Sequence, residues 1–116
     1  MSVPMSLPPF AAWRHLGSRE GFEVVFCGER CVCGHGAGME AGEPYGVRYE
    51  IVLDDRWHTR RARVWGRSRA GAYAVGLESD GEGHWTVDGV GRPEFDGLYD
   101  VDLEASSLTN AFPVRR

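Results

Sequence analysis

Residues 45–67, YGVRYEIVLDDRWHTRRARVWGR, decide the fold, because they form the clearest strand, turn and strand pattern in the chain. Along residues 45–53, Tyr45, Val47, Tyr49, Ile51 and Leu53 alternate with Gly46, Arg48, Glu50 and Val52, which is the period of a strand with one face in a core. Asp54 and Asp55 mark a turn. The second arm separates into a face of Thr59, Arg61, Arg63, Trp65 and Arg67 and a face of Arg60, Ala62, Val64 and Gly66. We expect the arginine and tryptophan face to be the functional one.

Short segments with strand character surround this hairpin. They are an edge strand or turn at residues 10–16 and strands at residues 22–27, 31–35, 72–78, 84–88 and 98–103. The glycine-rich residues 34–44 are expected to form a loop, and Asp80-Gly81 a tight connection. Sixteen glycines suit a turn-rich β protein better than a helical one. The pattern therefore predicts an all-β fold, an antiparallel meander curled into a roll or partial barrel.

The length and charge of the chain limit what it can be. Its 116 residues suffice for one domain, expected at residues 10–116 after a flexible lead-in at residues 1–9. The net charge of -4 argues against a nucleic-acid partner. No basic region precedes the first apolar residues, and no segment approaches the roughly 20 apolar residues of an integral membrane segment. Three cysteines suit reduced thiols, so we expect a cytoplasmic protein.

Two blocks carry a family pattern. Residues 49–66, YEIVLDDRWHTRRARVWG, and residues 84–116, HWTVDGVGRPEFDGLYDVDLEASSLTNAFPVRR, resemble the putative glycolipid-binding family of bacterial proteins. The resemblance implies a spirally curled antiparallel β-roll that binds a glycolipid or another amphiphile. It also implies that this chain is a short or truncated member. An unfinished roll would leave an exposed edge, and exposed edges pair with other chains, so a homodimer is expected.

The candidate ligand-binding residues combine guanidinium, indole, phenol and carboxylate groups. Guanidinium forks hold phosphate or carboxylate, and indole faces stack on sugars, so this set suits an anionic or sugar head group. The alternative is structural: buried arginines need partners, and Asp96 and the later aspartates could fix the last strand against the hairpin. The predicted site is Tyr49, Trp57, Arg60, Arg61, Arg63, Trp65, Trp85, Asp100 and Asp102.

A second cluster, Cys27, Cys31, Cys33 and His35, could supply four zinc ligands. Alternation along one strand spreads such ligands at steps of about 7 Å, so core or incidental thiols are the favoured interpretation and no cofactor is expected. The four histidines are scattered and no serine has a nucleophile-elbow context, so we expect a protein that is not an enzyme. Two alternatives stay open: a homodimeric interaction module without a small-molecule ligand, and a zinc module.

Overall fold

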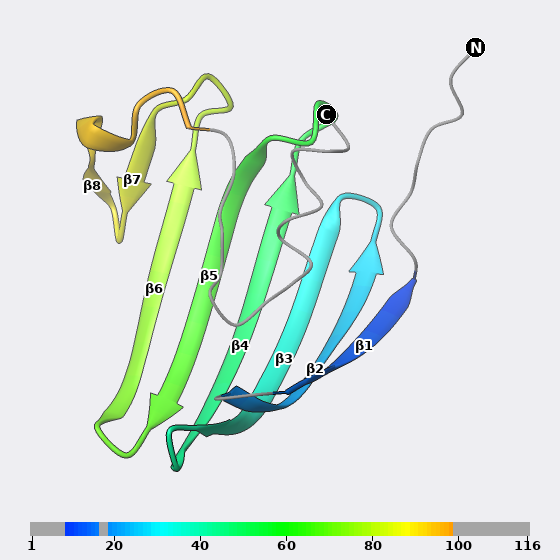
Figure 1. The fold of residues 1–116 in the computed structure, drawn as a ribbon. Helices are drawn as coiled ribbons and strands as arrows, with labels where there is room; N and C mark the ends of the chain where they lie inside the picture. Colours follow the sequence, from blue (N-terminus) through cyan, green and yellow to red (C-terminus); the bar gives the residue numbers. More distant parts are fainter. Residues whose placement is uncertain (1–8, 17–18, 99–116) are drawn as a thin grey trace.

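The structure is a computed structural model that describes residues 9–16 and 19–98. Eight strands form one antiparallel sheet in which each strand pairs with the next along the chain (Figure 1). A 3₁₀ helix, η1 (Pro93–Phe95), follows the last strand. The strands are β1 (Phe10–His15), β2 (Arg19–Gly28), β3 (Cys31–Glu40), β4 (Glu43–Leu53), β5 (Thr59–Ser68), β6 (Gly71–Ser79), β7 (Trp85–Val87) and β8 (Val90–Gly91).

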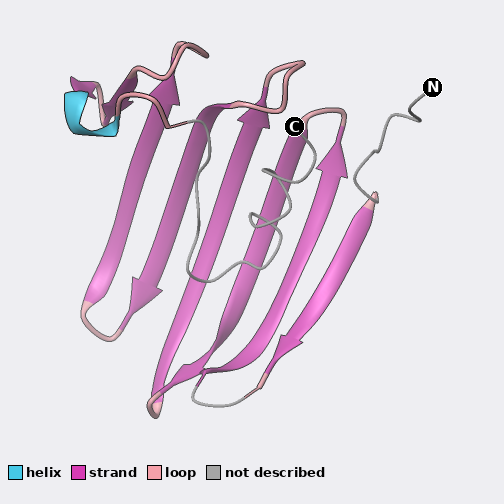
Figure 2. Ribbon diagram, turned by 45° about the horizontal axis from the view of Figure 1, so that its top comes forward, coloured by secondary structure: helices cyan, strands magenta, loops and turns pink. Residues whose placement is uncertain are grey.

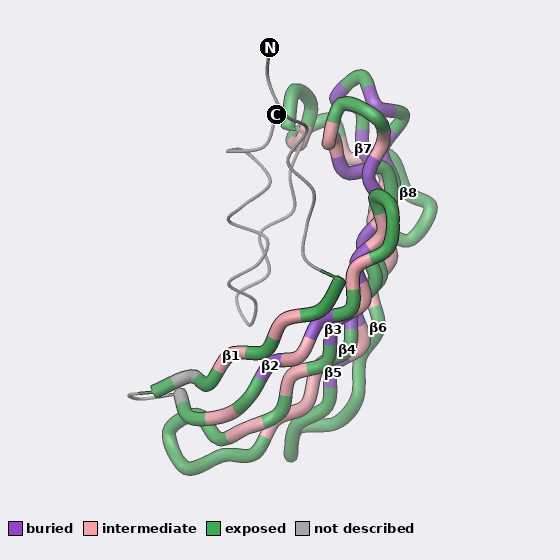
Figure 3. The backbone as a smooth tube through the Cα atoms, turned by 90° about the vertical axis from the view of Figure 1, so that its right-hand side faces the viewer, coloured by how far each residue is buried: buried purple, intermediate pink, exposed green. Residues whose placement is uncertain are grey.

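The sheet is curled but does not close on itself. Figure 2 shows all strands in a single layer, and Figure 3 shows that the sheet curves along its strands. This arrangement confirms the all-β antiparallel meander expected from the alternating apolar pattern. The expected strand at residues 98–103 lies outside the described residues, apart from Leu98. Among the described residues, no helix has the length and apolar character needed to cross a membrane.

The expected loop at residues 34–44 was wrong. Strand β3 continues to Glu40, and β4 begins at Glu43, so Ala41 and Gly42 alone make the turn. Both have positive φ, 51° and 82°, as a two-residue hairpin turn requires. The glycines within β3 had suggested a loop because glycine is unfavourable in strands. In the folded sheet, however, a Cβ at Gly34 would lie 2.1 Å from the ring of Tyr49, so this glycine makes room for a neighbouring side chain.

A β-bulge at the start of β5 changes which side chains share a face. Val52 pairs with Arg61, but Leu53 pairs with Thr59, so Arg60 is the extra residue on its strand. Thr59 is consequently turned to the side of Leu53 and is fully buried. Its expected place beside Arg61 was therefore wrong. Simple alternation failed here because one inserted residue reverses the facing of everything before it.

Paired residues in a sheet project to the same side, so the strand register defines two faces. The core face carries the buried apolar side chains Val25, Val32, Tyr49, Ile51, Leu53, Ala62, Val64 and Trp85. The hydroxyl of Tyr49 donates a 2.7 Å hydrogen bond to the buried Glu23 on the same face. The opposite face, called the arginine face below, carries Arg48, Arg61, Arg63, Trp65 and Arg67.

Candidate functional site

Strands β4 and β5 place the cationic side chains of the arginine face. Alternate residues of β5 project to this face, and the register sets Arg48 of β4 directly opposite Trp65 of β5. The guanidinium of Arg48 stacks over the indole, 4.1 Å from its centroid. A guanidinium over the negative face of an indole is attracted electrostatically and restricts both side chains. The arrangement gives the centre of the face a flat, cationic and aromatic surface.

One side of Trp65 borders an apolar groove of about 700 Å³. Small residues such as Ala37, Gly46 and Ala72 leave space over the sheet, while Phe22 and Val24 supply apolar surface. The complete lining is Ala12, Phe22, Glu23, Val24, His35, Gly36, Ala37, Gly46, Val47, Arg48, Trp65, Gly66, Arg67, Ala72 and Tyr73. The groove therefore offers apolar contact area with cations at its border.

The other side of Trp65 borders a second, more polar groove of about 390 Å³. Its lining is Arg61, Arg63, Trp65, Ala74, Val75, Gly76, Leu77, Glu78, Asp88 and Gly89. Asp88 is held in place, since its carboxylate accepts from Gly76 N and its own N–H donates to Gly76 O, both at 2.7 Å. Asp88 and Gly89 have φ values of 49° and 85°, which is the geometry of the two-residue turn between β7 and β8. This turn brings a carboxylate to the groove.

Arg61 and Arg63, the two arginines of the polar groove, differ from other arginines of the chain in their ion pairing. Within the described ranges, neither Arg61 nor Arg63 forms an ion pair with a carboxylate at 4.0 Å or less. Both side chains belong to exposed residues of β5. Other arginines do form such pairs: Arg69 lies 3.1 Å from Glu43, and Arg56 lies 3.3 Å from Glu82. Among the described residues, the polar groove therefore offers a ligand two guanidinium groups that have no carboxylate partner.

The structure brings together only part of the site predicted from sequence. Arg61, Arg63 and Trp65 share the arginine face and line the polar groove. Tyr49 and Trp85 lie in the core, on the opposite face. Trp57 lies in the turn after β4, with a φ of 64°. Arg60 lies in the bulge, where its Nε donates a hydrogen bond to Ser79 O at 2.9 Å. Asp100 and Asp102 lie outside the described residues.

Sequence reasoning missed most of the residues that line the two grooves, among them Arg48, Glu78 and Asp88. The signal for Arg48 was present, because an antiparallel hairpin closed at residues 54–58 sets Arg48 near Trp65. Glu78 could have been found in the same way from the pairing of β5 with β6. Asp88 had no such signal, since it reaches the groove through a turn two strands away from Arg63.

Cys31 and Cys33 interact with each other, but the four side chains of the cysteine cluster do not come together at one site. Cys27 pairs with Val32 on the core face, whereas Cys33 and His35 pair with Glu50 and Arg48 on the arginine face. In the part of the chain that the structure describes, no group of three or more histidine, cysteine, aspartate or glutamate side chains could hold a metal ion. Desolvation by burial is the largest cause of the raised pKa of the Cys27 and Cys33 thiols, which favours the unreactive protonated form.

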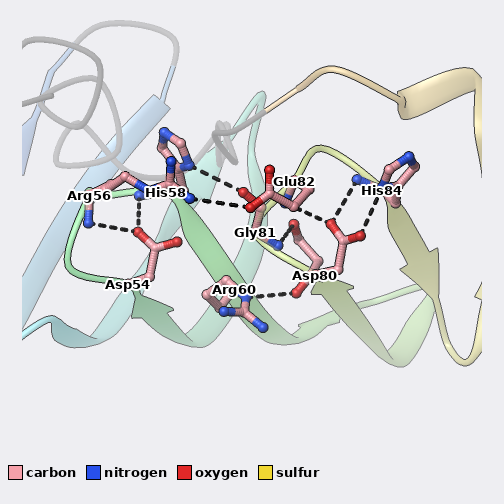
Figure 4. Close-up of polar contacts among 9 residues, drawn as sticks. Asp54, Arg56, His58, Arg60, Asp80, Gly81, Glu82 and His84 are labelled. Carbon is pink, nitrogen blue, oxygen red and sulfur yellow. Dashed lines mark hydrogen bonds and ion pairs between the residues drawn. The ribbon is translucent and has the colours of Figure 1, made fainter.

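Two loops at one end of the sheet share a motif and contact each other (Figure 4). They read DDRWH at residues 54–58 and DGEGH at residues 80–84. In each, the carboxylate of the first residue accepts hydrogen bonds from the backbone N–H groups of the third and fifth, at 2.9 and 3.0 Å for Asp54 and at 2.7 and 3.2 Å for Asp80. Nδ1 of His58 lies 3.4 Å from Gly81 O and links the two loops. These contacts fix the ends of the strands that carry the polar groove.

Electrostatics in these loops follow from the same hydrogen bonds. Burial acts to raise the pKa of Asp54, but the N–H groups of His58 and Arg56 outweigh it and lower that pKa. The N–H of Glu82 is the main cause of the lowered pKa of Asp80. The hydrogen bond to Asp80, at 2.7 Å, raises the pKa of the exposed His84. The loop at residues 80–84 therefore holds an ion pair in the pH range between the lowered pKa of Asp80 and the raised pKa of His84.

A protein-family model described as "Putative glycolipid-binding" matches residues 10–116, nearly the whole chain. The chain belongs to this family. The crystal structure of a DUF1089 family protein from Pseudomonas aeruginosa is similar to it, with a TM-score of 0.79 and 34% identity over 90% of this chain. The match covers 57% of that longer chain, so this glycolipid-binding family member spans little more than half the length of its structural neighbour. A search of curated proteins found no match.

Proposed function

We propose that this protein binds a glycolipid or another amphiphile on its arginine face and does not catalyse a reaction. The apolar part of the ligand lies in the apolar groove, and its polar head lies in the polar groove. The family description supports an amphiphilic ligand of this kind. The observation that carries the proposal is that Trp65 lines both grooves, so that one ligand can occupy both at once.

The chemistry of the two grooves matches the two parts of an amphiphile. Each methylene removed from water contributes about 0.8 kcal/mol, so eight methylenes against Phe22 and Val24 would contribute about 6 kcal/mol before ordering costs. Arg48, stacked on Trp65, stands where the chain of such a ligand would meet its head. The guanidinium groups of Arg61 and Arg63, which form no ion pair within the described residues, can then donate hydrogen bonds to oxygen atoms of the head.

The proposal is tested by titrating the protein with n-decyl maltoside below its micelle concentration in a calorimeter. Ala37→Glu, which places a charge in the apolar groove, is expected to weaken binding by about tenfold, the penalty for one polar group against an alkyl chain. Ala70→Glu introduces the same charge in an exposed turn outside both grooves and serves as the control. Equal binding by the two variants contradicts the placement of the alkyl chain.

The head is tested separately with the double variant Arg61→Ala, Arg63→Ala. We expect it to lose at least about fivefold in affinity, since two guanidinium groups that can donate to the head are removed. Arg69→Ala is the matched control, because Arg69 pairs with Glu43 outside both grooves. Unchanged affinity in the double variant would remove the polar groove from the proposal.

An interaction module that forms a homodimer is the second candidate. Strand β1 stands at one end of the sheet order, and Phe10 on this strand is 66% exposed. Free strand edges with exposed apolar side chains favour pairing with a second chain. Light scattering after size exclusion distinguishes the candidates: a dimer that Ala12→Pro dissociates, together with no binding of decyl maltoside, favours the interaction module.

A further inference from the structure

The polar groove carries an equal number of positive and negative side chains. Arg61 and Arg63 come from β5, Glu78 from β6 and Asp88 from the turn after β7. The register sets Arg61 directly opposite Glu78. Arg63 is opposite Gly76, whose N–H donates to the carboxylate of Asp88. Each guanidinium therefore has one carboxylate on the far side of the groove.

These opposite charges do not neutralise each other by direct contact. Among the residues that the structure describes, neither couple approaches within the 4.0 Å of an ion pair. The carboxylate of Asp88 is held by the backbone of Gly76 and cannot move freely toward Arg63. The groove thus presents donors from β5 and acceptors from β6 and the β7–β8 turn, of which Asp88 is held in place, with the indole of Trp65 at its border.

We propose that the head group bound here is an uncharged sugar and not a phosphate, a sulfate or an amine. This inference rests on the proposed function and specifies its ligand. A hydroxyl group both donates and accepts, so neighbouring hydroxyls can bridge a guanidinium and a carboxylate. An anionic head would meet Glu78 and Asp88, and a cationic head would meet Arg61 and Arg63, with like charges repelling across a short distance. The apolar face of a sugar ring also matches the indole.

The test compares two ligands with the same chain, n-decyl maltoside and n-decyl phosphate, each titrated below its micelle concentration at low salt. We expect the wild-type protein to bind the maltoside at least about tenfold more tightly, because like-charge contacts oppose the phosphate. Glu78→Gln with Asp88→Asn removes both negative charges and keeps the side-chain shapes. This double variant is expected to bind the maltoside about fivefold more weakly and the phosphate about tenfold more tightly.

The double variant should fold, since asparagine also favours the φ of 49° found at position 88 and its amide oxygen can accept from Gly76 N. Glu43→Gln removes a carboxylate outside both grooves and should leave the ratio of the two affinities unchanged. A wild-type protein that binds both ligands equally, or prefers the phosphate, overturns the inference and leaves the proposed function standing. If the double variant has the same ratio of maltoside to phosphate affinity as the wild type, the inference is likewise overturned and the proposed function stands. If the protein binds neither ligand, the proposed function is overturned together with this inference.

Discussion

The ring of Tyr49 lies across Gly34 of the neighbouring strand, and its hydroxyl donates a 2.7 Å hydrogen bond to Glu23 of the strand beyond. Both Tyr49 and Glu23 are buried, with exposed fractions of 0% and 1%. A side chain that spans three strands ties β2, β3 and β4 together in the most buried part of the sheet. The ring of Tyr49 can lie there only because residue 34 is glycine, since any Cβ at this position would occupy the volume of the ring.

Gly34→Ala is therefore expected to destabilise the protein by about 2–3 kcal/mol, the cost of forcing a methyl group into a packed core. Gly28→Ala is the control, because a Cβ there has its nearest neighbours at an ordinary 3.9 Å. Urea unfolding followed by fluorescence measures both free energies. Similar values for the two variants would show that the ring of Tyr49 can move aside.

Gly66→Ala tests whether an exposed ring can move away from an added methyl group when the buried ring of Tyr49 cannot. The ring of Tyr73 lies 2.2 Å from the position of a Cβ at Gly66, a contact as close as that at Gly34. Tyr73, however, is 59% exposed and can rotate into solvent. We expect Gly66→Ala to cost about 1 kcal/mol or less, below Gly34→Ala in the same unfolding measurement. A larger cost than at Gly34 would contradict this account.

Tyr49→Phe removes one hydrogen bond from a buried carboxylate and is expected to cost about 1–2 kcal/mol of unfolding free energy. Tyr73→Phe, at an exposed ring, should change stability by no more than about 0.5 kcal/mol. Chemical denaturation of the two variants beside the wild type checks the difference. Equal stability of Tyr49→Phe and the wild type would mean that the hydrogen bond from Tyr49 to Glu23 contributes nothing to the free energy of unfolding.

Thr59→Val should stabilise the protein by about 1 kcal/mol. Oγ1 of Thr59 is buried and has no hydrogen-bond partner among the described residues, and a buried hydroxyl without a partner carries a desolvation cost. Valine has the same shape without the hydroxyl. Thr59→Ser, which keeps the hydroxyl and removes the methyl group, should lower stability in the same assay. A loss of stability in Thr59→Val would indicate that the hydroxyl is satisfied in solution.

The loop at residues 80–84 should contribute to the pH dependence of stability with two opposite signs. The folded pKa of Asp80 is below its ordinary 3.8, so this contribution is present above that pH and is lost as the pH falls through the folded pKa. The folded pKa of His84 is above its ordinary 6.5, so this contribution is present below pH 6.5 and is lost as the pH rises through the folded pKa.

Two variants separate these contributions in unfolding free energies measured from pH 3 to pH 9. Asp80→Asn should flatten both the acid and the neutral part of the curve, because it removes the carboxylate on which both depend. His84→Gln should flatten mainly the neutral part, since Asp80 keeps its backbone hydrogen bond from Glu82. An unchanged neutral part in Asp80→Asn would contradict the pairing of these two residues.

The hairpin at residues 45–67 shows which structural features a local sequence pattern can predict. Its alternation correctly predicted two antiparallel strands and the shared facing of Arg61, Arg63 and Trp65. It failed at Thr59, because a bulge depends on how two strands pair and leaves no mark in the alternation itself. Just before the hairpin, the loop expected at residues 34–44 was wrong, because Gly34 makes room for the ring of Tyr49 and Gly38 for the backbone of Glu20, and both neighbours come from other strands.

The sequence by itself determined the fold class, the family and the run of arginines, since these depend on periodicity, motif order and charge along one stretch of chain. Only the tertiary structure decided which of the predicted site residues share a surface. Tyr49 and Trp85 turned out to be core residues, and Glu78 and Asp88 joined the arginines. The physical reason is that a groove is formed by side chains from different strands, and strand register and turn geometry, which are non-local, determine which side chains meet.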